Sequence, residues 1–363
     1  MKVYINCRFL TQRITGVQRF AFELCKALDS LLTDVNDLQI IALMPNREIN
    51  AQYTDYVFRN IKITPCGKLS GHLWEQLELP LCSCGGLLIN LCNTAPLLKF
   101  KQVITLHDAI FMTNLDSQKW WFKAWYRLIA QVTVLSAKFI FTVSEFSKTE
   151  IVRLLAVDPE RIVVLGNAPS LQNYAYDNNV FTRFELVDKK YFLIIGSNST
   201  RKNTQMVTNL FATDSRFSQA TLVIVGGKYV NLGVVDEIVA ANLIYTDYIA
   251  DGELRSLYAN AEALIFPSFY EGFGIPVVEA MAESTFVIAA DIPVLREVCG
   301  ESALYFLATD RQQLFNCILL LQTQPELRER FIKSGFQQLT NFKWDLFAKI
   351  VFDKLLLDVK EKE

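Results

Sequence analysis

The sequence predicts an α/β protein made of two similar domains in tandem, each a parallel sheet covered by helices. Short β-branched runs alternate with segments of helical periodicity along almost the whole chain, which is typical of parallel strands joined by helical crossovers. The alternation stops once, in NAPSLQNYAYDNN between Gly166 and Asp188, where we expect the linker. With 363 residues, the chain is too long for one core and suits two domains of about 150 residues.

Seven strands are predicted in the first half of the chain. The first begins at Val3, and the helix after it begins near Gly16. The other six are expected at Leu38–Met44, Ile61–Thr64, Leu87–Leu91, Val103–Leu106, Phe139–Val143 and Ile162–Leu165. Ser144 and Ser147 both suit the cap of the helix that follows the sixth strand, and Ser147 has capping-box spacing to Glu150.

Six further strands are predicted after the linker. They are expected at Phe192–Ile195, Leu222–Val225, Leu243–Tyr245, Leu264–Phe266, Val287–Ala289 and Leu304–Phe306. Asp251 is suited to cap a helix with an apolar face. The last predicted helix runs from Trp344 to about Lys360. Because ligands of open parallel sheets bind beyond the carboxyl ends of the strands, functional residues are expected just after strands, in the cleft between two facing domains.

Composition excludes several classes of protein. Hydrophobic residues make up 51% of the chain and charged residues 20%, which excludes a disordered chain. With 36 basic and 38 acidic residues, there is no global basic field to hold nucleic acid. The longest uncharged stretch, Leu79–Leu98, is broken by Pro, Gly and Asn, so no spanning helix is expected. The chain begins without a secretory signal pattern, so we expect it in the cytoplasm, with its eight scattered cysteines as buried free thiols and no structural metal.

The most informative segment is PSFYEGFGIPVVEAMAE, Pro267 to Glu283, which directly follows a predicted strand. Its glycines permit a tight turn into a helix, so the amides of Phe273 and Gly274 are expected to form a site for an anion or a hydroxyl. Glu271 and Glu279 can face one cavity, where carboxylates accept hydrogen bonds from a sugar or ribose diol. The alternative is one capping glutamate and one surface glutamate.

Three further segments of the sequence carry candidate residues. In IIGSNSTRKN, Arg201 and Lys202 are placed to neutralise a phosphate or diphosphate; the alternative is a solvated basic loop. Gly16 opens a helix, or forms a simple turn. His107 follows the strand VITL, and its alternative is a structural histidine. His72, in SGHLWEQ, is expected to be structural.

Several catalytic signatures are missing from the sequence. No G-x-G-x-x-G follows a strand, and no G-x-x-x-x-G-K-[ST] occurs, which argues against a dinucleotide-dependent dehydrogenase and against a P-loop nucleotidase. There is no G-x-S-x-G elbow and no Asp-x-Asp triplet that would hold a divalent metal with a nucleotide diphosphate.

These motifs resemble retaining glycosyltransferase family 4, whose fold is GT-B. TGVQRF, LHDAIF, FTVSEFSKTEI, RKN, LVIVGG and YEGFGIPVVEAMA occur in the order of that family and cover nearly the whole chain. GHLWEQLELP and RKN look most like bacterial mannosyltransferase-like members that build surface polysaccharides. The resemblance implies an acceptor-binding domain at 1–168, a nucleotide-sugar-binding domain at 169–342, and a helix at 343–363 that returns to the first domain.

The resemblance also implies how the donor is bound. Gly16 would line the donor diphosphate, Arg201 and Lys202 would neutralise it, and Glu279 would bind the nucleotide ribose. Many members carry Arg directly after the strand glycine, where this chain has Ser197, so Arg201 is expected to serve both roles.

At the donor sugar, the resemblance implies that Glu271 and the amides of Phe273 and Gly274 hold the sugar, with His107 at the junction of sugar and acceptor. Members need no metal or other cofactor and retain the anomeric configuration through a front-face attack assisted by the donor phosphate. Family members usually carry Gly and Pro in the turn after the E-x7-E helix, where this chain has Ser284 and Phe286, so the shape of that turn is open.

The expected function is hexosyl transfer from a GDP-, UDP- or dTDP-linked sugar to a glycan or polyprenyl-diphosphate-linked acceptor. The alternatives are a GT-B-like epimerase or phosphorylase, or an inactive member that acts as an assembly partner. The segment SQKWWFKAWYRLIAQ, Ser117 to Gln131, mixes aromatic and basic residues, which suits a peripheral contact with the inner face of the membrane. Its alternative is an aromatic helix packed in the first domain.

Overall fold

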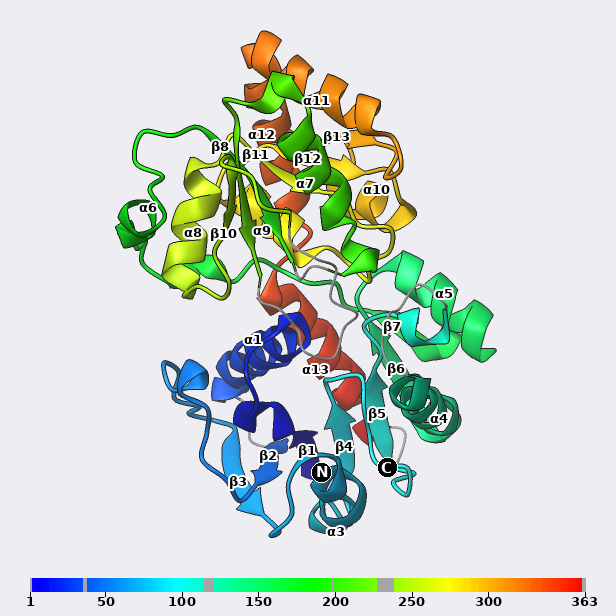
Figure 1. Ribbon diagram of the computed structural model, residues 1–363. Helices are drawn as coiled ribbons and strands as arrows, with labels where there is room; N and C mark the ends of the chain where they lie inside the picture. The colour runs from blue at the N-terminus through cyan, green and yellow to red at the C-terminus, as the bar shows by residue number, and fades with distance from the viewer. Residues whose placement is uncertain (1, 35–37, 114–119, 197–198, 227–237, 361–363) are drawn as a thin grey trace. The chain divides into compact units, whose positions relative to one another are not determined.

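The chain divides into two compact units. A computed structural model describes residues 2–34, 38–113, 120–196, 199–226 and 238–360 (Figure 1). Within these residues, the first unit comprises 2–34, 38–112, 121–167 and 343–360, and the second comprises 113, 120, 168–196, 199–226 and 238–342. The division after Asn167 falls where the strand and helix pattern of the sequence breaks.

The first unit contains one parallel sheet. Its seven described strands lie in the order β3-β2-β1-β4-β5-β6-β7, and every neighbouring pair is parallel. The strands are β1 (Lys2–Asn6), β2 (Gln39–Pro45), β3 (Lys62–Cys66), β4 (Leu87–Asn90), β5 (Gln102–Thr105), β6 (Ala137–Thr142) and β7 (Ile162–Val164). All seven predicted strands are confirmed, with ends shifted by one or two residues.

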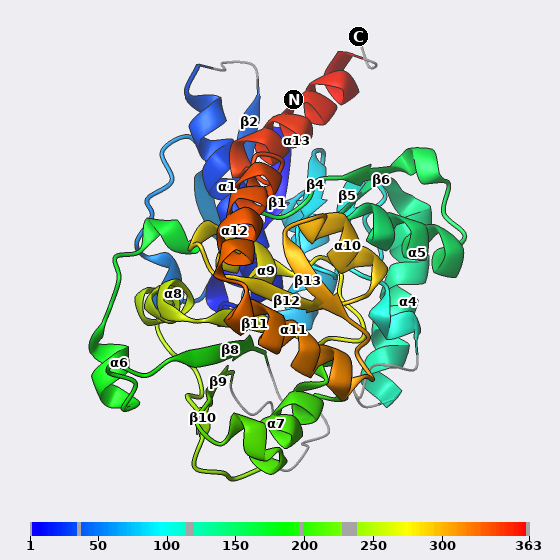
Figure 2. The ribbon, with the colours of Figure 1, turned by 90° about the horizontal axis from the view of Figure 1, so that it is seen from above.

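Helices cover this sheet, and the last of them comes from the end of the chain. They are α1 (Gly16–Leu31), α2 (Gly71–Leu73), α3 (Leu79–Cys82), α4 (Trp120–Ser136), α5 (Glu145–Leu155) and α13 (Trp344–Lys360), with a π-helical turn at Trp74–Glu78 between α2 and α3. Helix α13 runs alongside α1 in Figures 1 and 2, and the Trp344 ring meets the Phe20 ring edge-on with centroids 5.7 Å apart. The expected return of the C-terminal helix to the first unit is therefore confirmed.

The second unit has the same design. Its six described strands lie in the order β10-β9-β8-β11-β12-β13, all parallel. The strands are β8 (Tyr191–Ile195), β9 (Thr221–Val225), β10 (Leu243–Tyr245), β11 (Ala263–Phe266), β12 (Val287–Ala290) and β13 (Ala303–Phe306). The helices are α6 (Asn179–Arg183), α7 (Thr204–Thr213), α8 (Asp251–Asn260), α9 (Ile275–Ala282), α10 (Pro293–Cys299), α11 (Arg311–Thr323) and α12 (Pro325–Leu339). All six predicted strands are present.

Of the three predicted cap residues, Ser144 is confirmed, and Ser147 and Asp251 are wrong. Ser144, not Ser147, caps α5, because the Ser144 hydroxyl accepts a hydrogen bond from the Ser147 amide at 3.0 Å. The Ser147 hydroxyl instead donates to the carbonyl of His107 at 3.1 Å. At α8 the capping residue is Ala250, and the Glu253 carboxylate accepts from its amide at 2.9 Å, so the helix does not begin with Asp251 as its cap.

Each sheet has a point at which the strand order reverses. In the first unit β1 lies between β2 and β4, and in the second β8 lies between β9 and β11. Ligands of open parallel sheets bind outside the carboxyl ends of the strands at such points. Asn6 and Asn90 end the two central strands of the first unit, and Ile195 and Phe266 end those of the second.

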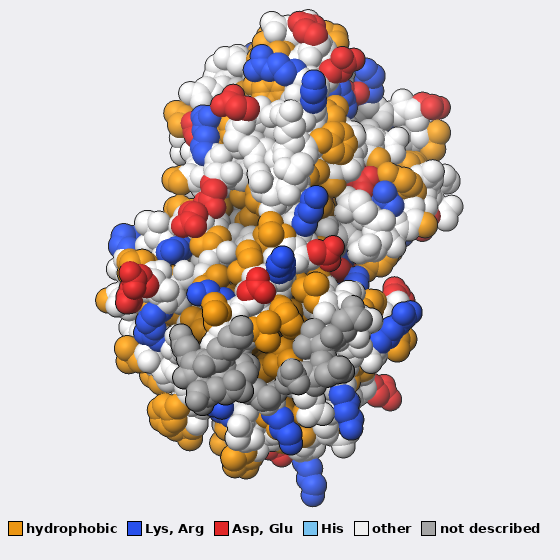
Figure 3. Space-filling model, turned by 180° about the vertical axis from the view of Figure 1, so that it is seen from behind, with side chains coloured by type: hydrophobic (Ala, Val, Ile, Leu, Met, Phe, Trp, Pro, Cys, Tyr) orange, Lys and Arg blue, Asp and Glu red, His pale blue; other side chains and the backbone are white. Residues whose placement is uncertain are grey.

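The surface and the cysteines add three observations. Acidic and basic side chains are interspersed on the face that Figure 3 shows.

All eight cysteines are free, but only Cys7, Cys25 and Cys299 are buried and Cys84 is exposed, so the expectation of buried thiols is wrong for most of them. Within the described ranges, no helix has both the length and the apolar character needed to cross a bilayer.

Gly166 provides a test of how α13 is attached to the first unit. Its φ is +96°, and an added Cβ would lie 2.5 Å from the Phe347 ring of α13. Gly166→Ala is expected to lower the free energy of unfolding by about 2–4 kcal/mol, from backbone strain and overpacking together. Gly85→Ala is the control, since Gly85 has a φ of +77° but nothing within 4 Å of an added Cβ. Equal losses in urea unfolding of the two variants would contradict this packing.

Candidate active site

Two loops beyond the carboxyl ends of β8 and β11 are joined in the second unit. Arg201 and Lys202 lie in a short 3-10 turn just ahead of α7. The Phe269 amide of the β11 loop donates to the Arg201 carbonyl at 2.9 Å. Asn203, in left-handed conformation with a φ of +52°, donates from its side chain to the carbonyls of Pro267 at 3.1 Å and Ala308 at 2.7 Å. The two predicted motifs therefore form one structural element.

Glu271 is the centre of this element. One carboxylate oxygen accepts from Lys202 Nζ at 2.7 Å, and the other lies 3.0 Å from Arg201 Nη1. Arg201 Nη1 also donates to the Tyr270 carbonyl at 2.9 Å. Burial alone would raise the pKa of the Glu271 carboxyl, but the charges of Arg201 and Lys202 and hydrogen bonds outweigh it and lower the pKa to about 2. Two cations around one carboxylate leave a net positive charge at the strand ends, which suits a phosphate.

Glu279 lies on α9 and has a different partner. Its Oε2 accepts from the Tyr258 hydroxyl of α8 at 3.1 Å, and it is buried. The sequence predicted that Glu271 and Glu279 share a cavity; the described contacts attach them to separate neighbours, Arg201 and Lys202 on one side and Tyr258 on the other.

The turn into α9 depends on Gly274. Its φ is +105°, and an added Cβ would lie 2.9 Å from a Leu295 methyl group, so a side chain is disfavoured here. The Phe273 side chain is buried and meets the Phe342 ring edge-on at 5.3 Å. Any ligand contact by Phe273 must therefore come from its backbone, as the sequence analysis assumed.

Gly16 and His107 belong to the first unit. Gly16 is exposed and is the first residue of the 16-residue helix α1, whose N-terminal amides are suited to an anion. His107 is buried: its ring Nε2 donates to the Leu91 carbonyl at 3.0 Å, and the ring meets Phe20 edge-on at 4.7 Å. Burial lowers the pKa of His107 to about 4, so the imidazole is neutral at neutral pH and can accept a hydrogen bond at Nδ1 but cannot act as a charged acid.

The two departures from the family pattern fall in different places. Ser197 lies outside the described residues. Ser284 adopts a φ of +60°, the left-handed conformation that glycine adopts without strain, and the Thr285 amide closes the turn on the Ala280 carbonyl at 2.8 Å. Phe286 is buried against Phe331, with ring centroids 5.2 Å apart. The turn is thus formed without Gly or Pro.

Comparison with known proteins finds a family model that matches part of the second unit. Residues 177–338 match the family model described as "Glycosyl transferases group 1". This match covers most of the second unit, which is called the group 1 domain below, after the model that it matches. It contains Arg201, Lys202, Glu271, Phe273, Gly274 and Glu279.

Relatives extend beyond this group 1 domain. The chain is 31% identical over 245 residues to the O-antigen chain mannosyltransferase RfbU of Salmonella typhimurium, covering 66% of this chain and 65% of RfbU. It is 31% identical over 222 residues to the O-antigen chain mannosyltransferase B of Escherichia coli, covering 58% of each. The alignments thus span somewhat less than two thirds of the length of these relatives.

Solved structures show that both units share the fold of known glycosyltransferases. The chain superposes on Anabaena Alr3699/HepE, solved in complex with UDP-glucose, with a TM-score of 0.72 and 13% identity over 98% of both chains. Together with the two parallel-sheet units, this shows the GT-B fold that the sequence motifs led us to expect.

The ion pairs of Glu271 predict a pH-dependent stability of the group 1 domain. The pKa of Glu271 is about 2 in the folded protein and about 4.3 in the unfolded chain. The ionised carboxylate therefore stabilises the fold fully above about pH 4.3, and this contribution is lost as the pH falls toward 2. Glu271→Gln should be less stable than wild type by about 3 kcal/mol at neutral pH, and the difference should shrink in acid.

Urea unfolding from about pH 6 down to about pH 3 measures this difference. Glu150→Gln is the control, since Glu150 pairs with Arg153 at 2.9 Å on the exposed face of α5, where an ion pair contributes little. A stability difference for Glu271→Gln that stays constant over this range would contradict the depressed pKa.

Proposed function

We propose that this protein is a glycosyltransferase that moves a hexose, mannose or a related sugar, from a nucleotide sugar to a glycan or lipid-linked acceptor during synthesis of a surface polysaccharide. The observation that carries the proposal is the cluster of Arg201, Lys202 and Glu271 in the group 1 domain. The O-antigen mannosyltransferases among the relatives support the sugar and the pathway class. The UDP-glucose complex of the structural neighbour supports a nucleotide sugar as donor, with GDP, UDP or dTDP as candidate nucleotides.

The proposed chemistry follows from the charges. A leaving nucleoside diphosphate carries about two negative charges, and preorganised cations stabilise that charge as it develops. Arg201 and Lys202 are held in place by Glu271, so they need little rearrangement to meet the diphosphate. Glu279, oriented by the Tyr258 hydroxyl, offers carboxylate oxygens to the ribose hydroxyls. In the first unit, Gly16 would meet the diphosphate and the neutral His107 would accept a hydrogen bond at the sugar.

Retention of configuration is part of the proposal. With Glu271 bound to two cations, its carboxylate is a poor nucleophile toward the sugar, which favours attack by the acceptor on the front face with the donor phosphate taking the acceptor proton. Incubation with candidate sugar nucleotides tests the reaction class: release of nucleoside diphosphate with a new glycoside of unchanged anomeric configuration supports transfer. Isomerised sugar, phosphate-dependent cleavage or no reaction would indicate the epimerase, phosphorylase or inactive alternatives.

Lys202→Ala and Glu279→Ala are expected to lose about ten- to a hundredfold in donor affinity or turnover, because each removes one charged hydrogen bond to the donor. Binding of GDP, UDP and dTDP by thermal shift, followed by steady-state kinetics, measures the loss. The matched controls are Lys190→Ala and Glu262→Ala. Lys190 is exposed and Glu262 is half-buried; they pair at 3.6 Å beside the amino end of β8, the opposite end of the strand from Lys202, and Glu262 also pairs with Arg328. Wild-type kinetics in either donor-site variant would refute the assignment.

Activity is expected to persist in EDTA. We infer metal independence from the two cations, Arg201 and Lys202, which supply at the diphosphate the charge that a divalent ion would otherwise supply. Initial rates with and without EDTA, with added Mg²⁺ or Mn²⁺ as the comparison, measure this. Complete loss on chelation that either metal restores would show that the site needs an ion.

A peripheral contact with the membrane is also proposed, on α4. Of the segment singled out in the sequence, residues 117–119 lie outside the described residues. Trp120 and Trp121 are 80% and 56% exposed, so these rings are not in the core. Trp125 is half-buried and meets the His72 ring edge-on at 6.3 Å. Exposed apolar residues continue along α4 and along the neighbouring segment 71–82; they are Leu73, Leu77, Leu81, Leu128 and Leu135.

Sedimentation with vesicles of phosphatidylglycerol and phosphatidylcholine tests this contact. The wild type should pellet at low salt, and Trp120→Ser/Trp121→Ser and Lys119→Glu/Lys123→Glu should pellet less, because the first removes inserted rings and the second removes attraction to anionic lipid. Phe336→Ser is the control, an exposed aromatic residue of the second unit. A wild type that stays in the supernatant would disprove the contact.

A further inference from the structure

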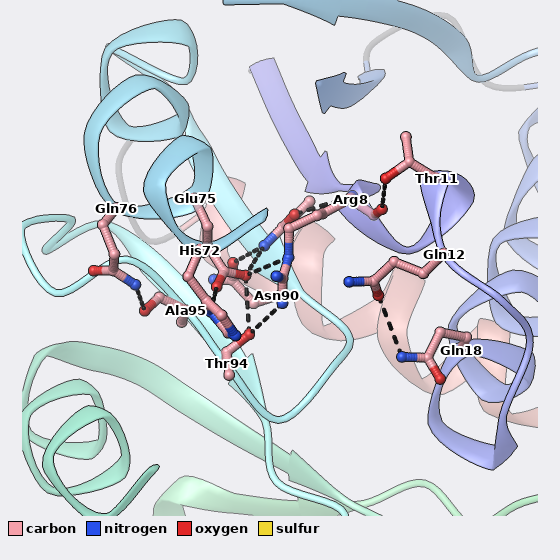
Figure 4. Close-up of polar contacts among 11 residues, drawn as sticks. Arg8, Thr11, Gln12, Gln18, His72, Glu75, Gln76, Asn90, Thr94 and Ala95 are labelled. Carbon is pink, nitrogen blue, oxygen red and sulfur yellow. Dashed lines mark hydrogen bonds and ion pairs between the residues drawn. The ribbon is translucent and has the colours of Figure 1, made fainter. Parts of the chain in front are cut away.

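A buried polar cluster lies in the first unit, where β1 and β4 end. Figure 4 shows Arg8, His72, Glu75 and Thr94 joined by hydrogen bonds and ion pairs. Asn90 is joined to them through Asn6, whose Nδ2 donates to Asn90 Oδ1 at 3.0 Å. They come from the 3-10 turn Arg8–Thr11 after β1, from α2 and the π-helical turn that follows it, and from the end of β4 and the loop after it. This is the point at which the strand order of the first sheet reverses, the place where open parallel sheets bind ligands. The cluster is not part of the proposed donor site.

Glu75 is its centre and is 1% exposed. Its Oε1 accepts from Asn6 Nδ2 at 2.9 Å and Thr94 Oγ1 at 3.0 Å, and lies 3.4 Å from Arg8 Nε. Its Oε2 accepts from His72 Nδ1 at 3.2 Å. Burial raises the pKa of Glu75, but Arg8, His72 and the hydrogen bonds outweigh it and the pKa is lowered. Glu75 is therefore a carboxylate at neutral pH.

The carboxylate determines which ring nitrogen of His72 carries the proton. A carboxylate only accepts hydrogen bonds, so Nδ1 must donate to Glu75, and Nε2 is the ring nitrogen that remains for a ligand. The His72 side chain is 39% exposed. Within the part of the chain that the structure describes, neither His72 Nε2 nor Arg8 Nη1 makes a hydrogen bond to another residue. Neither is among the buried polar atoms that lack a partner, so both are open to solvent.

The surroundings of His72 are aromatic. Its ring meets the Trp125 and Tyr126 rings of α4 edge-on, with centroids 6.3 and 6.4 Å away. Aromatic side chains beside a few placed polar groups are typical of small-molecule sites. A buried ion pair adds little net stability in general, and π-helical turns occur frequently at functional sites. Nε2 of His72 and Nη1 of Arg8 are the atoms of the cluster at which a ligand can replace water.

We propose that Arg8 and His72 form a subsite for a sugar hydroxyl of the acceptor, with Glu75 as a positioning residue that holds both. His72 Nε2 forms a hydrogen bond with the sugar hydroxyl, which can donate or accept, and Arg8 Nη1 donates to a sugar oxygen. As an acceptor subsite it rests on the proposed function; as a sugar-binding site it stands on this cluster alone.

Binding of simple glycosides in the absence of donor tests the subsite. The probes are methyl α-mannoside, methyl α-galactoside and methyl N-acetyl-β-glucosaminide, measured by saturation-transfer NMR on the full chain. Wild type should bind at least one, and His72→Ala should bind it about three- to tenfold more weakly, as for the loss of one hydrogen bond. Glu78→Gln is the matched control: Glu78 is on the same π-helical turn, but its carboxylate accepts from the amides of Lys68 and Leu69.

Wild type that binds none of the three glycosides, or His72→Ala that binds as wild type does, overturns the subsite. Binding of GDP, UDP and dTDP should be unchanged in His72→Ala. If none of these nucleotides binds wild type while a glycoside does, the proposed function fails and the sugar site stands.

The positioning role of Glu75 has its own measurement. The chain has two histidines, so two-bond ¹H–¹⁵N spectra resolve both rings without ambiguity once His72→Ala identifies one set. Wild type should show His72 protonated at Nδ1, and Glu75→Gln should lose that preference and weaken glycoside binding to the extent that His72→Ala does. A His72 ring protonated at Nε2 in wild type, or an unchanged tautomer in Glu75→Gln, overturns the positioning role.

Discussion

The pairing of Glu271 with Arg201 and Lys202 is the interaction on which the group 1 domain's candidate site depends. The carboxylate is 8% exposed, and a buried charge at that depth is tolerated only when it is paired and hydrogen-bonded. Two cations satisfy it, at 2.7 and 3.0 Å. Because these ion pairs join the loop after β8 to the loop after β11, they hold the two loops together and place a net positive charge where both strands end.

Hydrogen bonds of Asn203 also hold the loop after β8 in place. Asn203 is the residue that the sequence analysis overlooked, although it belongs to the RKN triplet. Its left-handed backbone turns the chain into α7, and its amide binds carbonyls of two other loops, at Pro267 and Ala308. The nearest signal for it in the sequence is its residue type, since asparagine adopts positive φ more readily than most residues. The cations are therefore positioned by neutral hydrogen bonds as well as by charge.

The first unit uses the same principle with different residues. Glu75 in the first unit and Glu271 in the second both lie beyond strand ends, at the point where the strand order of their sheet reverses. Here one arginine and one imidazole meet the carboxylate, together with Asn6 and Thr94. The Glu75 cluster is therefore closer to neutral than the Glu271 cluster, which carries a net positive charge. This is the difference expected between a site that binds hydroxyls and a site that binds phosphates.

The sequence by itself determined the strands, their division into two series and the loops that carry the chemistry. This is because β-branched runs and helical spacing are local patterns, and because parallel strands send their functional residues to one edge. It did not show that Ser147 and Asp251 are not helix caps. The Ser147 hydroxyl donates instead to the carbonyl of His107, which is forty residues away in the sequence. Nor did it show the partners of Glu271, Glu279 or His72. Those contacts join residues that are distant in sequence or placed by a π-helical turn, and only folding brings their atoms within hydrogen-bond distance.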